Sequence, residues 1–137
     1  MDKLINLDYI LDKSQAKVIN PQVLAFIGDS VYALFMKTYI VKNFSGKANN
    51  LNTLSNNLVK ATKQSDMVEE LLATFDEEEM AVYKRARNYK TANTAKHASI
   101  SEYHRATGLE AVIGYLYLTN NTDRMNEILE KCIGEKQ

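Results

Sequence analysis

The sequence predicts an all-α fold, and three observations support that prediction. The 137 residues include one proline and five glycines, whereas turn-rich β folds use both residues freely. Apolar residues recur at helical spacing in several segments, which is typical of amphipathic helices. Apolar residues make up 45% of the chain and charged residues 25%, as in ordinary globular domains. A chain of this length has room for one core, so we expect residues 1–137 to form a single helical domain.

Two helices are predicted at the start of the chain. A short apolar run over residues 4–11 predicts a small first helix, which the polar stretch after it ends. Asn20 and Pro21 predict the start of a long second helix. The Asn side chain can accept a free backbone N–H, and Pro at the first helical position has no N–H to leave unpaired. We expect this helix to end between Asn43 and Gly46.

The middle of the chain predicts three further helices. Apolar stripes over residues 51–61 and 67–75 predict two of them, with Ser65 as the N-cap of the second. Thr74 and Glu77 match a capping box, the pattern in which two side chains satisfy each other's backbone N–H groups. The third helix should therefore start there and run to Arg87.

The C-terminal part predicts a long loop and two helices. Residues 88–99 carry no apolar period, and a loop of that length in a small domain is often functional. Apolar residues then recur from Leu109 until the helix stops near Asn120. We expect the last helix to cover residues 122–133, with Gly134 as its C-cap.

Charge is distributed unevenly along the chain. The formal net charge is zero, so the chain as a whole has no attraction for a polyanion. Residues 83–107, however, contain six basic residues and only one acidic residue, Glu102. A basic segment rich in Asn, Thr and Ser suits the phosphate backbone of a nucleic acid. A solvated surface loop is the alternative interpretation, because short basic runs are common.

Two features indicate a cytoplasmic protein without a membrane segment. Cys132 is the single cysteine, so it has no partner for an internal disulfide and belongs to no zinc-binding cluster. The N-terminal segment has charges within its apolar run and lacks the small residues of a cleavage site. We expect no stretch of about eighteen apolar residues able to span a membrane.

Three glycines and two acids suggest a close contact between distant segments. Gly28, Gly108 and Gly114 lie inside helical patterns, where each costs about 1 kcal/mol relative to Ala. Small residues let two helices cross closely, and such a crossing would bring Asp29 and Glu110 together. Both acids are surrounded by apolar residues, where an unpaired carboxylate is costly. They either pair with Lys, Arg or a helix N-terminus, or they hold Mg²⁺, which takes one or two carboxylates.

Two segments carry a family resemblance. Residues 20–32, which include Ile27-Gly28-Asp29, and residues 105–118, which include Gly108-Leu109-Glu110-Ala111, resemble the catalytic domain of ribonuclease III. The resemblance runs from about Asn20 to Asn120 and is greatest to the Mini-III subfamily. That subfamily lacks the double-stranded RNA-binding domain, and we expect no such domain here.

The resemblance implies a function and a mechanism. It implies a cytoplasmic, Mg²⁺-dependent endoribonuclease that cuts double-stranded RNA and leaves 5′-phosphate and 3′-hydroxyl ends. Asp29 and Glu110 would be the catalytic acids that hold the metal. The implied substrate is 23S ribosomal RNA precursor, with a ribosomal protein as a possible helper in shaping it. A twofold homodimer would supply one centre for each strand.

The chain departs from full-size ribonuclease III at three acidic positions. Ala25 and Gln22 stand where that enzyme has glutamates, and Thr107 stands where it has an aspartate. Mini-III members are similarly reduced. The departure leaves a second hypothesis open, namely a catalytically inactive protein of the same fold that binds RNA or a ribosome. A third hypothesis is a helical protein-interaction module with an acidic partner.

The resemblance also indicates which residues would bind RNA and which would lie at a dimer interface. Phe26 matches the aromatic residue at the family's dimer interface, and core packing is its alternative role. His97 and His104 are candidate general bases by residue type, but their positions in the loop and near the start of a helix favour contact with RNA or packing at the surface. The residues that would grip RNA are Arg85, Arg87, Asn88, Lys90 and Lys96, with Lys60 and Lys63 as weaker candidates.

Overall fold

The structure confirms the all-α prediction. It is a computed structural model that describes residues 9–44, 47–59, 61–89 and 99–133. Within these ranges it contains seven helices and no strand, in agreement with the predicted number of helices. The helices are α1 (Lys13–Lys17), α2 (Pro21–Asn43), α3 (Ala48–Val59), α4 (Ala61–Leu72), α5 (Glu77–Arg87), α6 (Ile100–Leu118) and α7 (Thr122–Ile133).

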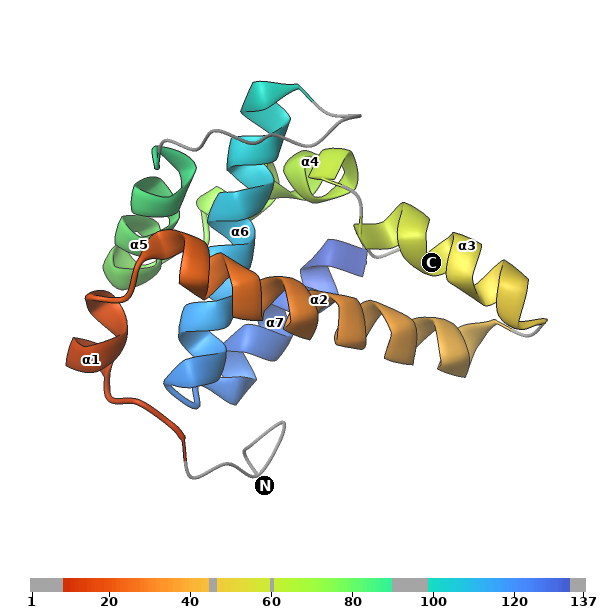
Figure 1. Ribbon diagram of the computed structural model, residues 1–137, viewed down its shortest axis with the longest axis horizontal. Coiled ribbons are helices and arrows are strands. Elements are labelled where there is room, and N and C mark those ends of the chain that lie inside the picture. Colours follow the sequence, from red (N-terminus) through yellow and green to blue (C-terminus); the bar gives the residue numbers. More distant parts are fainter. Residues whose placement is uncertain (1–8, 45–46, 60, 90–98, 134–137) are drawn as a thin grey trace.

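Two long helices form the centre of the fold. In Figure 1, α2 crosses in front of α6, and this pair makes the most extensive helix contact in the described part of the chain. α4, α5 and α7 pack around α6, while α3 follows the C-terminal half of α2. The position of any residue on α2 relative to α6 is therefore fixed from several sides.

The core lies between these helices. Leu24 and Met36 of α2, Leu109 and Ile113 of α6, and Ile128 of α7 are all fully buried. Burying one such side chain contributes about 1.5 to 3 kcal/mol. Buried residues from α1, α2 and α4–α7 form one continuous hydrophobic cluster. Packing against this cluster explains how these helices form a defined fold.

Capping boxes define the starts of three described helices, α1, α5 and α6, and the box of α5 differs from the prediction. The Asp76 carboxylate accepts a hydrogen bond from the backbone N–H of Glu79 at 2.8 Å, and the Glu79 carboxylate accepts one from the Asp76 N–H at 3.0 Å. The capping box of α5 is therefore Asp76 with Glu79, and the predicted box of Thr74 with Glu77 was wrong. The Thr74 hydroxyl instead donates to the Leu71 carbonyl at the end of α4. Ser99 with Glu102 caps α6 in the same way.

Two other predicted boundaries also change. Ser65 lies inside α4, which already begins at Ala61, so it is not an N-cap. The first helix of the described residues occupies Lys13–Lys17, where Asp12 forms a capping box with Gln15. Residues 9–12 are not helical, and residues 1–8 lie outside the described ranges. The predicted starts of α2 and α7 and the end of α5 at Arg87 are confirmed; Gly134 lies outside the described ranges.

The length and composition of α2 contradict one expectation. Pro21–Asn43 is long and apolar enough to cross a membrane by those two criteria alone. Its apolar character has an explanation in the fold, because Leu24, Val31, Tyr32, Met36 and Ile40 are buried against the other helices. The helix therefore has the pattern of a central core helix.

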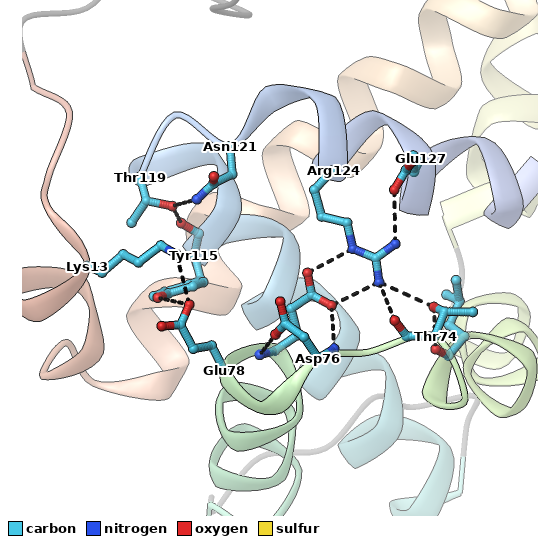
Figure 2. Close-up of polar contacts among 11 residues, drawn as sticks. Lys13, Thr74, Asp76, Glu78, Tyr115, Thr119, Asn121, Arg124 and Glu127 are labelled. Carbon is cyan, nitrogen blue, oxygen red and sulfur yellow. Dashed lines mark hydrogen bonds and ion pairs between the residues drawn. The ribbon is translucent and has the colours of Figure 1, made fainter.

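A buried ion pair joins α7 to the start of α5. Glu79 is 2% exposed, and Arg124 donates to its two carboxylate oxygens at 2.8 and 2.9 Å. Arg124 also donates to the Thr74 carbonyl at 2.8 Å and to Glu127 at 3.1 Å (Figure 2). Since each charge is paired and hydrogen-bonded, the cost of burial is offset. The pair fixes the turn between α4 and α5 against α7.

Candidate active site

Glycines allow the closest approach of α2 and α6. A Cβ atom on Gly28 would stand 1.7 Å from the Glu110 carbonyl oxygen, and one on Gly114 would stand 2.0 Å from the Leu24 carbonyl oxygen. Real Cβ atoms do not approach backbone atoms this closely. The prediction that these two glycines permit a tight helix crossing is confirmed. Gly108 has a different partner, because a Cβ there would meet the Tyr83 ring of α5 at 2.6 Å.

The crossing brings Asp29 and Glu110 together. Asp29 follows Gly28 on the exposed side of α2, while Glu110 of α6 is partly buried. The two carboxyl groups are close enough to hydrogen-bond to each other. Two residues separated by 81 positions in the sequence thus form one acidic site at the centre of the fold.

Burial and the neighbouring acid perturb Glu110. The pKa of the Glu110 carboxyl is raised well above its ordinary value, first because burial disfavours the charged form and second because of the Asp29 charge beside it. The side chain of Gln64 on α4 opposes this shift. Acids with such perturbed pKa values are concentrated at functional sites.

The acid pair lacks a basic partner in the part of the chain that the structure describes. The ion pairs there involve other acids, namely Glu69, Glu78, Glu79 and Glu127. Of the two interpretations of Asp29 and Glu110, pairing with a basic group therefore finds no support among the described residues. The chemistry of the donors, two neighbouring carboxylates with no basic partner among the described side chains, fits a divalent cation.

A third acid does not join the pair within the described residues, where no cluster of three or more His, Cys, Asp or Glu side chains occurs. Ala25 is buried in the core and Gln22 is partly exposed at the start of α2. The Thr107 hydroxyl donates to the Tyr103 carbonyl at 2.9 Å, within its own helix. The three positions at which the sequence departs from full-size ribonuclease III thus provide no carboxylate here.

Sequence reasoning missed Gln64. This residue of α4 is 1% exposed, and its Nε2 has no hydrogen-bond partner of normal geometry among the described residues. A signal was present, because Gln64, Val68 and Leu71 are spaced as one helix face, and an amide interrupts that apolar face. The predicted start of the helix at Ser65 excluded Gln64 from the pattern.

The structure describes three of the five main residues predicted to bind RNA, namely Arg85, Arg87 and Asn88. Arg85 donates to the backbone carbonyls of Lys17 and Ile19, so its guanidinium also holds the segment between α1 and α2. Arg87, the last residue of α5, lies over the Tyr83 ring at 5.5 Å and donates to Asn88 at 3.1 Å. These three candidates lie on the last turn of α5 and its C-cap, directly before the predicted RNA-binding loop. Their role in binding RNA stays a prediction.

The remaining candidates lie partly outside the described residues. Lys90, Lys96 and His97 belong to the range 90–98, which the structure does not describe, and Lys60 is outside the described ranges as well. Lys63 belongs to α4. His104 is partly buried on α6, where its ring packs edge-on against Tyr103. The grip of the loop and the role of either histidine therefore stay predictions.

Phe26 lies at the surface. Its side chain is 74% exposed, so the alternative of core packing is wrong. Three other exposed apolar residues of the same helix, Val23, Leu34 and Val41, lie on its side of α2 at helical spacing. An exposed apolar stripe of this kind is typical of an interaction surface.

Comparison with known proteins identifies the family. The profile of the family described as "Ribonuclease III domain" matches residues 22–121, which include both acids and both crossing glycines. The chain belongs to the ribonuclease III family and is an endoribonuclease of that family. Ribonucleases of this family act on double-stranded RNA.

The relatives narrow the assignment within the family. The chain is 47% identical over 122 residues to the Mini-ribonuclease 3 of Clostridium tetani, with 88% of this chain and 81% of the relative covered. It is 38% identical over 119 residues to the Mini-ribonuclease 3 of Staphylococcus aureus, with 85% and 89% covered. A crystal structure of a protein from Fusobacterium nucleatum superposes with a TM-score of 0.80 at 30% identity, with 88% and 97% covered. The two Mini-ribonuclease 3 relatives confirm the resemblance to the Mini-III subfamily.

Proposed function

We propose that the protein is a Mg²⁺-dependent endoribonuclease that cuts double-stranded RNA at a site made by Asp29 and Glu110. The observation that carries the proposal is the acid pair at the α2–α6 crossing, which has no basic partner among the described residues. Mg²⁺ takes one or two protein carboxylates and completes its octahedron with water and phosphate oxygens. Two acids therefore suffice for such a site.

The chain's own residues would hold and orient the reacting groups. Asp29 and Glu110 would supply carboxylate oxygens, and the glycine crossing would keep the two side chains at a fixed separation. When bound, Mg²⁺ activates water and neutralises charge on the phosphate. Hydrolysis by water, with departure of the 3′ oxygen, leaves 5′-phosphate and 3′-hydroxyl ends. A protein nucleophile is not required.

The proposal also covers how both strands of the RNA are cut and how the duplex is recognised. One acid pair cuts one strand, so cutting a duplex requires two, and a twofold homodimer formed through the α2 surface around Phe26 would supply them. Double-stranded RNA is recognised by its shape, its phosphates and its 2′-hydroxyls. The basic segment after α5 would make those contacts. We propose 23S ribosomal RNA precursor as the substrate, because the resemblance to the Mini-III subfamily implies it.

A catalytically inactive RNA- or ribosome-binding protein is the second candidate, because the departures at Ala25, Gln22 and Thr107 leave two acids. A cleavage assay separates the two. With Mg²⁺, the protein should cut a defined RNA duplex and leave its single-stranded control intact. Asp29→Asn and Glu110→Gln should each abolish cutting while duplex binding persists. Full activity in both variants would overturn the proposed mechanism, and duplex binding without cleavage by the unaltered protein would favour the second candidate.

A further inference from the structure

One buried polar side chain beside the acid pair has no evident role in the fold. Gln64 lies on the inward face of α4, and its Nε2 is buried without a hydrogen-bond partner among the described residues. A buried amide in that state destabilises a protein, because its hydrogen bonds to water have not been replaced. An apolar side chain of the same size would suit this position better if packing were its only role.

The Gln64 side chain lies beside Glu110, one of the two acids of the candidate site. α4 packs against α6 (Figure 1), and the Gln64 side chain lies within hydrogen-bonding reach of the Glu110 carboxyl. The Gln64 amide is a hydrogen-bond donor whose Nε2 is unpaired among the described residues, so a carboxylate oxygen of Glu110 can accept a hydrogen bond from it.

We propose that Gln64 is a positioning residue of this site, whose amide donates a hydrogen bond to Glu110 and holds its carboxylate in the orientation that shares a divalent cation with Asp29. The inference rests on the proposed function and deepens it. Mutation of a residue that orients a metal ligand typically lowers metal affinity or activity about 10- to 100-fold. Gln64 is almost fully shielded from solvent, so it does not itself touch RNA.

Ser55 provides a matched control. Its Oγ is likewise buried without a hydrogen-bond partner in the described part of the chain, and the residue is 3% exposed. Ser55 lies on α3 and lines a pocket of about 220 Å³ together with Lys37, Ile40 and Leu51. It thus shares the burial and the missing partner of Gln64 but not the neighbouring acid pair.

The test compares Gln64→Met, which keeps the side-chain length and removes the amide, with Ser55→Ala. Titration calorimetry measures Mn²⁺ affinity without RNA, steady-state cleavage gives kcat and KM, and thermal unfolding gives Tm. For Gln64→Met we expect Mn²⁺ affinity and kcat to fall about 10- to 100-fold, with KM for the duplex unchanged. Its Tm should stay close to the parental value, because methionine keeps the length and the buried packing of the side chain. Ser55→Ala should leave affinity and kcat unchanged. Parental affinity and kcat in Gln64→Met would overturn the inference.

The same measurements separate this inference from the proposed function. If the unaltered protein binds Mn²⁺ and Gln64→Met binds it equally well, only the role of Gln64 is overturned. If the unaltered protein binds no Mn²⁺, the proposed function itself is overturned. Should Gln64→Met not fold, a crystal structure of the unaltered protein with Mn²⁺ decides the question. Gln64 Nε2 should then lie within about 3.2 Å of a Glu110 oxygen, and an amide directed elsewhere would overturn the inference.

Discussion

Gly28 and Glu110 meet through their backbones, so closely that a Cβ on Gly28 would lie 1.7 Å from the Glu110 carbonyl oxygen. The contact is made by the residue directly before Asp29 and by the second acid itself. The separation of the two carboxylates is thus set by backbone packing and does not depend on flexible side chains alone.

Gly28→Ala should therefore destabilise the protein, although helix propensity alone predicts a gain of about 1 kcal/mol. The added methyl group forces α2 away from α6, and we expect a decrease of about 3 kcal/mol in the free energy of unfolding. Urea denaturation measures it. Ser30→Ala, an exposed substitution two positions along the same helix, is the control and should change stability by less than about 0.5 kcal/mol. Equal free energies of unfolding for both variants would show that α2 can move away from α6 without loss of stability.

Glu110→Gln should stabilise the metal-free protein, and the gain should grow with pH. The pKa of Glu110 is raised in the folded state, so the unaltered protein loses stability as the pH rises above the ordinary value of 4.5 and through the raised pKa. Glutamine carries no charge at any pH, so the Glu110→Gln variant does not lose this stability as the pH rises. Thermal unfolding in a chelator at several pH values measures the difference. Glu70→Gln, at an exposed position of α4, should show no such trend. A Glu110→Gln gain that shrinks as the pH rises would contradict the burial of this acid beside Asp29.

Arg87→Gln should weaken binding of duplex RNA without lowering Tm. Removing one phosphate-binding cation reduces the slope of log affinity against log salt by about one. Binding titrations over a salt series, made in Ca²⁺ or with Asp29→Asn to prevent cleavage, measure the slope. Lys131→Gln, in the last turn of α7, should retain the parental slope. An unchanged slope for Arg87→Gln would remove this residue from the RNA-binding surface.

Phe26→Asp should convert a dimer into a monomer, because a carboxylate would replace the most exposed large apolar side chain of α2. Sedimentation or light scattering measures the mass in solution. Val18→Asp, at an apolar residue that is also exposed but lies between α1 and α2, should leave the mass unchanged. A dimer that persists in Phe26→Asp would place the interface elsewhere.

The sequence predicted the long helices well because their signals are local. Asn20 with Pro21 marks the start of α2 by side-chain chemistry that needs no distant partner, and the structure places the helix there. The capping box of α5 was misplaced by two residues, since the sequence contains two overlapping patterns and Thr74 resembles a cap. The choice between them depends on Arg124, which binds Glu79 from α7. That contact is not visible in local sequence.

The candidate site was predictable in its two acids but not in its surroundings. Glycines inside helical patterns indicated the crossing and the two acids beside it, and the family resemblance assigned the catalytic role to Asp29 and Glu110. The place of Gln64 depends on how α4 packs against α6, and the exposure of Phe26 depends on which side of α2 faces the core. Both are properties of tertiary packing, which periodicity within a single helix does not determine.

Crystals soaked in Mn²⁺ provide the sharpest test of a metal site at the acid pair, because Mn²⁺ scatters anomalously and can replace Mg²⁺ at oxygen ligands. We expect an anomalous peak between the carboxylates of Asp29 and Glu110, within about 2.5 Å of an oxygen from each. A peak elsewhere, or a lysine or arginine side chain seated between the two acids, would contradict the proposed site.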